Sequence, residues 1–338
     1  MTRFTISIIV LATVCVRPAA AQGPDIHDTR LLSQPAISET HIAFVYDGDI
    51  WVAGRDGAGP RRLTTHIGTE AGPRFSPDGG WIAFSGQYDG NTDVFIVPTA
   101  GGVPQRLTWH PGSDVVLGFT PDGSAVLFRS ARVVHTNRHT QLFTVPLEGG
   151  MPTRLPIPHA FKATFSPDGG HVAYVPLGER FGEWKNYRGG TVTRIWIYDV
   201  ATHAVEEIPQ PEGRSNDTDP MWLDGRIVFR SDRNGEFNLF TFDPATKAVS
   251  QITRHEDFPI LNVSAGAGKI VYEQASYLHE FDPATSGSAR IRIGIAADLN
   301  ETRPRYASGN RYIRNAARRA ERRPSGVRVS RRDRDRSR

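Results

Sequence analysis

Cysteine is nearly absent from the sequence, which has only Cys15 among 338 residues. This residue lies in the apolar run from Phe4 to Val16, which follows Arg3 and precedes the small residues Ala19 to Ala21. Such an order is typical of a secretory signal peptide, here cleaved after Ala21, and the run is too short to span a bilayer. We therefore expect a periplasmic or secreted protein without a membrane span. Its mature chain would have no disulfide, no thiol nucleophile and no cysteine-based zinc site.

The sequence also lacks the local motifs of common catalytic sites. It has no Gly-x-Ser-x-Gly nucleophile elbow and no Gly-x-x-x-x-Gly-Lys phosphate loop. His279 and Glu280 are not followed by a second histidine at the spacing of a zinc protease. Each of these motifs exists for a mechanical reason, so its absence is informative. We predict no catalytic residue, no bound metal and no cofactor in this chain.

Most of the chain has no excess of basic residues, although the net charge of the whole sequence is +4. Residues 301–338 contain 14 arginines and four acidic residues, a formal charge of +10, so the remainder carries −6. A mildly acidic body is not typical of a nucleic-acid binder, and we expect no nucleic-acid partner.

The arginine-rich segment 301–338 has the composition of a disordered tail. Our hypothesis is that a frameshift near Arg318 has truncated a longer protein, because a GC-rich gene read out of frame often yields arginine-rich sequence. The alternative is a genuine basic tail that binds anionic lipid or nucleic acid.

A ten-residue pattern repeats along the chain. The stretch from Phe75 to Phe84 recurs from Phe119 to Phe128 and from Phe165 to Tyr174, at steps of 44 and 46 residues. Each copy has an apolar strand, a Pro-Asp-Gly turn and a second apolar strand. In the turn, proline fixes φ and glycine accepts a positive φ. Weaker copies occur at His41–Phe44, Met221–Phe229 and Val263–Tyr272.

Each copy belongs to a unit of four short strands, which ends in a polar strand such as Gln105-Arg106-Leu107-Thr108. Four antiparallel strands in roughly 40–50 residues are the signature of a propeller blade, and neighbouring blades bury each other's faces. Six units between about Leu31 and Ile295 predict an all-β fold, a six-bladed β-propeller. Leu31 to Ile37 supplies the first strand of blade one. We therefore expect side-chain packing between blades one and six to close the ring, at its weakest junction.

The Ser-Pro-Asp-Gly turns and Arg-Leu-Thr ends resemble the propeller repeats of TolB and of tricorn-type proteases. Two segments favour the tricorn family: Trp184 to Thr191 with Arg194 to Ile197, and the opening from Pro35 to Trp51. The first is similar to a segment of the tricorn N-terminal propeller, inserted between the second and third strands of blade four. TolB would also place a small α/β domain ahead of its propeller, and residues 22–30 leave no room for one. The resemblance covers about residues 30–317.

In tricorn-type proteases a second propeller, a PDZ-like domain and a serine-peptidase core follow the first propeller. This sequence matches none of them, so no catalytic residue is carried over. The resemblance implies a propeller at residues 22–300, between the signal peptide at 1–21 and the tail at 301–338. It also implies a role in gating peptides or scaffolding, with peptides or proteins as partners and self-association as in tricorn-like assemblies. The alternatives are a TolB-like periplasmic protein-binding module and a propeller enzyme with a metal or sugar in its channel.

Two groups of residues are candidates for binding. Three histidines follow blade ends, each with a carboxylate after it: His66 with Glu70, His110 with Asp114, and His255 with Asp257. Near one mouth of the channel they could bind a metal or a peptide end, and the favoured alternative is that they fix loops by hydrogen bonds.

The second group is Trp184, Tyr187 and Arg188, in the insertion of blade four. Loops on a rigid ring are common binding sites, and aromatic and arginine side chains are common at protein contacts. We predict a contact with a domain or a peptide there. The alternative is that the insertion packs onto its own blade.

Overall fold

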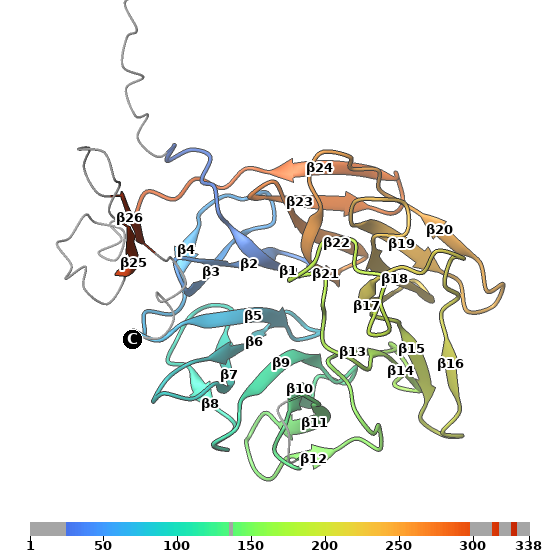
Figure 1. Ribbon diagram of the computed structural model, residues 1–338. Coiled ribbons are helices and arrows are strands. Elements are labelled where there is room, and N and C mark those ends of the chain that lie inside the picture. Colours follow the sequence, from blue (N-terminus) through green and yellow to red (C-terminus); the bar gives the residue numbers. More distant parts are fainter. Residues whose placement is uncertain (1–24, 135–137, 298–312, 318–325, 330–338) are drawn as a thin grey trace, which may run out of the picture.

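The computed structural model describes residues 25–134, 138–297, 313–317 and 326–329. Six four-stranded antiparallel sheets stand around a common axis, which confirms the predicted six-bladed propeller (Figure 1). Among the described residues, no helix is long and apolar enough to cross a membrane. The expected signal peptide at residues 1–21 lies outside the described residues.

Every blade uses four strands that are consecutive in sequence, and the first strand of each lies innermost (Figure 1). Blades one to three are β1 (Ser33–Ile37), β2 (His41–Tyr46), β3 (Asp49–Gly54), β4 (Arg61–Arg62); β5 (Glu70–Phe75), β6 (Trp81–Gly86), β7 (Asp93–Pro98), β8 (Gln105–Arg106); and β9 (Asp114–Phe119), β10 (Ala125–Ser130), β11 (Gln141–Pro146), β12 (Thr153–Arg154). Blades four to six are β13 (Lys162–Phe165), β14 (His171–Val175), β15 (Trp196–Asp199), β16 (Val205–Glu207); β17 (Asp217–Leu223), β18 (Arg226–Ser231), β19 (Asn238–Phe242), β20 (Val249–Gln251); and β21 (Ile260–Gly266), β22 (Lys269–Gln274), β23 (Tyr277–Asp282), β24 (Gly287–Ile291). Within the tail at 301–338, the structure describes only β25 (Ile313–Ala317) and β26 (Gly326–Val329), which pair antiparallel. For the other tail residues, disorder stays a prediction.

The Ser-Pro-Asp-Gly sequence forms the predicted turn between the first and second strands. In blade two, the Trp81 amide donates to Ser76 Oγ at 2.9 Å and the Gly80 amide donates to Asp78 Oδ1 at 3.0 Å. Gly79 has φ of 72°, a conformation that glycine adopts without steric cost. Hydrogen bonds from Ser76 and Gly80 lower the pKa of Asp78. Blades three and four repeat this turn with Thr120, Asp122 and Gly123, and with Ser166, Asp168 and Gly169.

The Arg-Leu-Thr sequence ties the short outer strand of a blade to its third strand. In blade two, Arg106 forms an ion pair with Asp93 at 2.6 Å, Leu107 is buried, and Thr108 Oγ1 accepts from the Val94 amide at 3.0 Å. The repeat therefore reflects a structural requirement: a two-residue strand has few ladder bonds, and these side chains add to them. Blade one repeats the arrangement with Arg62, Leu63, Thr64 and Asp49, and blade five with Gln251, Ile252, Thr253 and Asn238.

The hydrophobic core lies between blades rather than within them. Val45 and Ile50 of blade one pack with Phe84 and Phe95 of blade two. At the closing junction, Phe44 of blade one belongs to a cluster with Val271 and other residues of blade six. Because neighbouring blades cover both faces of each blade in this way, no blade is a separate folding unit.

Backbone hydrogen bonds add to the side-chain packing that we expected at the ring closure. The Thr29 amide donates to the Ile293 carbonyl at 2.8 Å, and the Ile295 amide donates to Thr29 Oγ1 at 2.8 Å. The Leu31 amide donates to the Ser276 carbonyl at 3.0 Å. The closing junction therefore joins the segments before β1 and after β24 directly. The expectation of packing alone was incomplete.

Gly57 lies at this junction and allows a test of it. Its φ is 88°, and a Cβ there would be 2.2 Å from the carbonyl oxygen of Arg292. We expect Gly57→Ala to lower the free energy of unfolding by about 2 kcal/mol, measured by urea denaturation. Gly59→Ala is the control, because Gly59 also has a positive φ but its Cβ would meet nothing within 4 Å. Equal losses in both variants would show that contact with Arg292 is unimportant.

Candidate functional site

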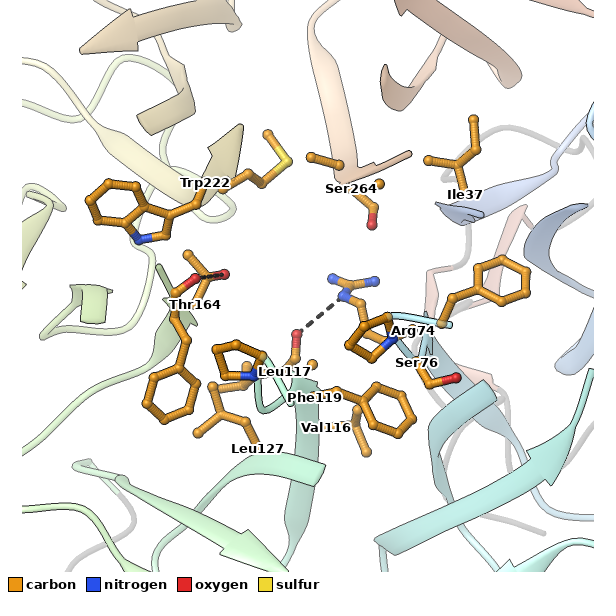
Figure 2. A pocket seen from close by; sticks show the side chains of 18 of the residues that line it. Ile37, Arg74, Ser76, Val116, Leu117, Phe119, Leu127, Thr164, Trp222 and Ser264 are labelled. Carbon is orange, nitrogen blue, oxygen red and sulfur yellow. Dashed lines mark hydrogen bonds between the residues drawn. The ribbon is translucent and has the colours of Figure 1, made fainter. Parts of the chain in front are cut away.

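A cavity of about 740 Å³ lies on the axis of the ring. The inner strands line it together with the turns that follow them, so it lies toward the end of the channel that carries the Ser-Pro-Asp-Gly turns. Figure 2 shows Ile37, Arg74, Thr164, Trp222 and Ser264 around the central space. These five side chains come from five different blades. The cavity therefore exists only when the ring is closed.

Two residues of the cavity wall, Lys162 and Asp219, belong to a network of two cations and two carboxylates. Lys162 of β13 contacts Asp219 Oδ1 of β17 at 2.5 Å, and Arg230 of β18 contacts Asp219 Oδ2 at 2.8 Å. Glu179, from the insertion of blade four, forms ion pairs with both cations. Burial alone would raise the pKa of Asp219, but the charges of Lys162 and Arg230 outweigh it and hold this pKa at about 2. Asp219 is therefore charged at neutral pH.

Two further arginines line the cavity without a carboxylate partner. Arg74 of β5 donates from Nε to the Leu117 carbonyl at 3.2 Å and from Nη1 to the Pro73 carbonyl at 2.8 Å (Figure 2). The guanidinium of Arg129, on β10, lies 3.6 Å from the ring centroid of Phe161, and its buried Nε has no hydrogen-bond acceptor. Within the part of the chain that the structure describes, neither arginine forms an ion pair. Burial lowers the pKa of Arg74, and it lowers that of Arg129 to about 10.

The three histidines predicted from the sequence lie in loops at the other end of the channel and do not line the cavity. His66 Nδ1 accepts from the Gly68 amide at 2.9 Å, and His110 Nδ1 accepts from the Gly112 amide at 2.9 Å. His255 Nε2 lies 3.1 Å from the Tyr272 hydroxyl. The contacts of His66 and His110 fix the loops in which these residues lie, and binding of a peptide end there stays a prediction. Over the described ranges, no group of three or more His, Asp or Glu side chains could hold a metal ion.

The carboxylates that follow these histidines have three different environments. Glu70 is buried at the start of β5 and accepts from Thr64 Oγ1 at 3.1 Å. Burial and the nearby charge of Asp49 raise the pKa of Glu70 to about 8. Asp114 is buried at the start of β9 and forms an ion pair with Arg132 at 2.5 Å. Asp257 is exposed. The structure therefore does not bring the three together as one cluster.

The candidate residues in the insertion between β14 and β15 contact blade five, while Arg194 of the same insertion pairs with Glu207 of its own blade. Arg188 Nη1 lies 2.7 Å from the buried Asp232 Oδ2, and Asn216 Nδ2 donates to the Tyr187 carbonyl at 2.9 Å. The rings of Trp184 and Tyr187 stack at 6.0 Å, and Trp184 is 62% exposed. The charge of Arg188 thus has a partner within the chain, whereas Trp184 is accessible.

Besides the predicted Trp184, three exposed apolar side chains lie at this end of the ring, and sequence reasoning missed them. Ile67, Trp109 and Phe258 are 77%, 64% and 55% exposed and lie in the β4–β5, β8–β9 and β20–β21 loops. In an antiparallel four-stranded blade these loops and the β14–β15 insertion are at the same end. We call the four residues the loop-face apolar set. Ile67, Trp109 and Phe258 each adjoin a residue that we predicted as a binding candidate. The hydrophobicity of these loop residues was the sequence signal that could have identified the surface.

The comparisons with known proteins show the family to which the chain belongs. A family model described as the tricorn protease N-terminal beta propeller domain matches residues 29–287. The chain is 31% identical over 274 residues to the putative tricorn protease homolog 2 of Streptomyces coelicolor, covering 78% of this chain and 23% of that protein. It is 25% identical over 289 residues to the tricorn protease homolog of Saccharolobus solfataricus, covering 83% of this chain and 26% of that protein. The chain thus spans about a quarter of the length of these relatives.

A solved structure gives the same result for the fold. The crystal structure of the tricorn protease superimposes with a TM-score of 0.71 and 24% sequence identity, over 80% of this chain and 27% of that chain. At this identity the likeness concerns the fold alone.

Proposed function

Since the chain belongs to the family of tricorn protease N-terminal β-propellers, we propose that it is a non-catalytic module of a proteolytic assembly. Its ring admits peptides into the axial cavity and holds neighbouring parts of the assembly in place. Peptides and proteins are its partners, including further copies of the chain. The sequence of residues 1–21 supports a periplasmic or secreted location.

The axial cavity is the observation that supports peptide admission. It has about 740 Å³, which lies in the range of sites for small ligands. Its wall combines apolar side chains such as Leu117 and Trp222 with the charged groups of Lys162 and Asp219. A mixed wall of this kind suits a peptide, which offers both apolar and polar groups along its length.

The loop-face apolar set supports the scaffolding part of the proposal. Exposed aromatic side chains are enriched at protein contacts, and Trp109 and Trp184 are both more than half exposed. The same surface would serve the alternative, a TolB-like protein-binding module, which needs no peptide in the cavity. Peptide binding in the cavity therefore distinguishes the two functions.

A plug in the cavity tests the proposed function. Gly118 lines the cavity, and a Cβ there would meet nothing within 4 Å, so Gly118→Trp places a large ring in the open space. We expect the purified chain to bind a labelled neutral pentapeptide without hydrolysing it, and Gly118→Trp to weaken binding at least tenfold in fluorescence anisotropy.

The matched control is Gly213→Trp, because Gly213 is exposed in a loop and its Cβ would also meet nothing within 4 Å. Its binding should equal that of the unmodified chain. Binding that survives the plug would favour the docking module, and hydrolysis by the purified chain would refute the non-catalytic role.

A further inference from the structure

Arg74 and Arg129 are the two arginines of the cavity wall, and neither forms an ion pair within the described residues. Lys162 and Arg230 share the carboxylates of Glu179 and Asp219. Arg74 instead donates to two backbone carbonyls, and Arg129 has an aromatic ring beside its guanidinium and a buried Nε without an acceptor. A half-buried charge without an ion-pair partner is costly, so the part of the wall around these two arginines is complementary to an anion.

The chemistry of the two side chains favours a carboxylate. A guanidinium offers a planar fork of N–H donors that matches the two oxygens of a carboxylate. In the neighbouring network a carboxylate already serves as the acceptor for a guanidinium, because Arg230 donates to Asp219 Oδ2 from both Nε and Nη2 at 2.8 Å. Burial lowers the pKa of both unpaired arginines, in agreement with a site from which water is largely removed.

The size and composition of the cavity favour a peptide over a small free anion. Its volume of about 740 Å³ far exceeds the space that one phosphate or acetate ion occupies. Val115, Leu117 and Trp222 add apolar surface to the cavity wall, and a bare ion would leave that surface without a contact.

We propose that the axial cavity is a binding site for short acidic peptides, in which Arg74 and Arg129 contact a carboxylate of the peptide. This inference rests on the proposed admission of peptides and adds the class of peptide. The carboxylate can come from an acidic side chain or from a C-terminus, and both present the same two oxygens.

Calorimetric titration with three acetylated pentapeptides tests the site. The first is Gly-Gly-Glu-Gly-Gly with an amidated end, the second has Gln in place of Glu, and the third is pentaglycine with a free C-terminus. We expect the Glu peptide to bind about tenfold to hundredfold more tightly than the Gln peptide, because a charged hydrogen-bonded pair contributes about 1.5–3 kcal/mol. The pentaglycine acid shows whether a terminal carboxylate serves equally.

Variants assign the effect to the two arginines. Arg74→Gln and Arg129→Gln should each reduce the preference for Glu over Gln about tenfold, and the double variant should abolish it. Arg226→Gln is the control, since Arg226 is exposed on β18, away from the cavity lining. Thermal unfolding checks the folded state, and removing an unpaired buried charge should not lower the unfolding temperature.

The outcomes separate this inference from the proposed function. Equal binding of the Glu and Gln peptides would overturn the inference and leave peptide admission in place, whereas no binding of either would overturn both. Inorganic phosphate that binds as tightly as the Glu peptide would show a site for free anions and contradict the peptide assignment. A Glu preference that persists in the double variant would overturn the role of the two arginines.

Discussion

Replacing Asp219 by Asn is expected to destabilise the ring by about 3–5 kcal/mol. Asp219 is the carboxylate that both Lys162 and Arg230 contact, and its removal leaves two largely buried cations with only Glu179. Breaking a buried ion pair from one side is strongly destabilising because the remaining charge has no partner. Asp219 has φ of 53°, which Asn tolerates, so the substitution changes the charge and not the backbone.

Urea denaturation measures this loss, and Glu206→Gln is its control. Glu206 forms an ion pair with Lys247 at 2.7 Å, but both side chains are about half exposed, so the loss there should stay below about 1 kcal/mol. The double variant Lys162→Met with Asp219→Asn should recover part of the stability, because it removes one unpaired charge. Similar losses for Asp219→Asn and Glu206→Gln would contradict the account of the network.

The second large effect is a loss of stability between pH 6.5 and pH 8 that depends on Glu70. Burial, followed by the charge of Asp49, raises the pKa of Glu70 from 4.5 to about 8 in the folded chain. The folded state therefore keeps a proton that the unfolded state releases above pH 4.5. The stabilisation is complete below that pH and is lost as pH rises toward 8, at most about 1.4 kcal/mol per pH unit.

Glu70→Gln isolates this contribution because it stays neutral at every pH. As pH rises from 6.5 to 8, the free energy of unfolding of the unmodified chain should fall more than that of Glu70→Gln. Asp257→Asn, at an exposed candidate position, should not change the pH profile. Parallel profiles for Glu70→Gln and the unmodified chain would show that Glu70 is ionised in the folded state. Because the comparison is a difference between two proteins, the lowered pKa values of His255 and His279 cancel from it.

The repeated turns determine how much of the fold could be predicted. Gly79, Gly123 and Gly169 occupy one position in three similar turns, and their spacing already implies blades of a common size. The blade number and the propeller class follow from that repeat, whereas the insertion point in blade four followed from the resemblance of Trp184 to Thr191 to a tricorn segment. The ring closure was only half predicted, since the hydrogen bonds that link Thr29 to Ile293 and Ile295 join segments without a repeat pattern.

The candidate site was much less predictable, for a geometric reason. Arg74, Arg129, Lys162 and Asp219 lie on different blades, and no local spacing relates them. The histidines were prominent in the sequence because they follow a repeated motif, but that motif places them in loops away from the cavity. The contact of Arg188 with Asp232 could likewise not be predicted from the sequence, because 44 residues separate the two.

A crystal structure of the purified chain with the acetylated, amidated Gly-Gly-Glu-Gly-Gly peptide tests the central claim most directly. We predict that the peptide lies in the axial cavity between the six inner strands, with its Glu carboxylate within hydrogen-bond distance of Arg74 and Arg129. A peptide bound at the loop-face apolar set, with the cavity empty, would contradict the claim that the ring admits peptides along its axis.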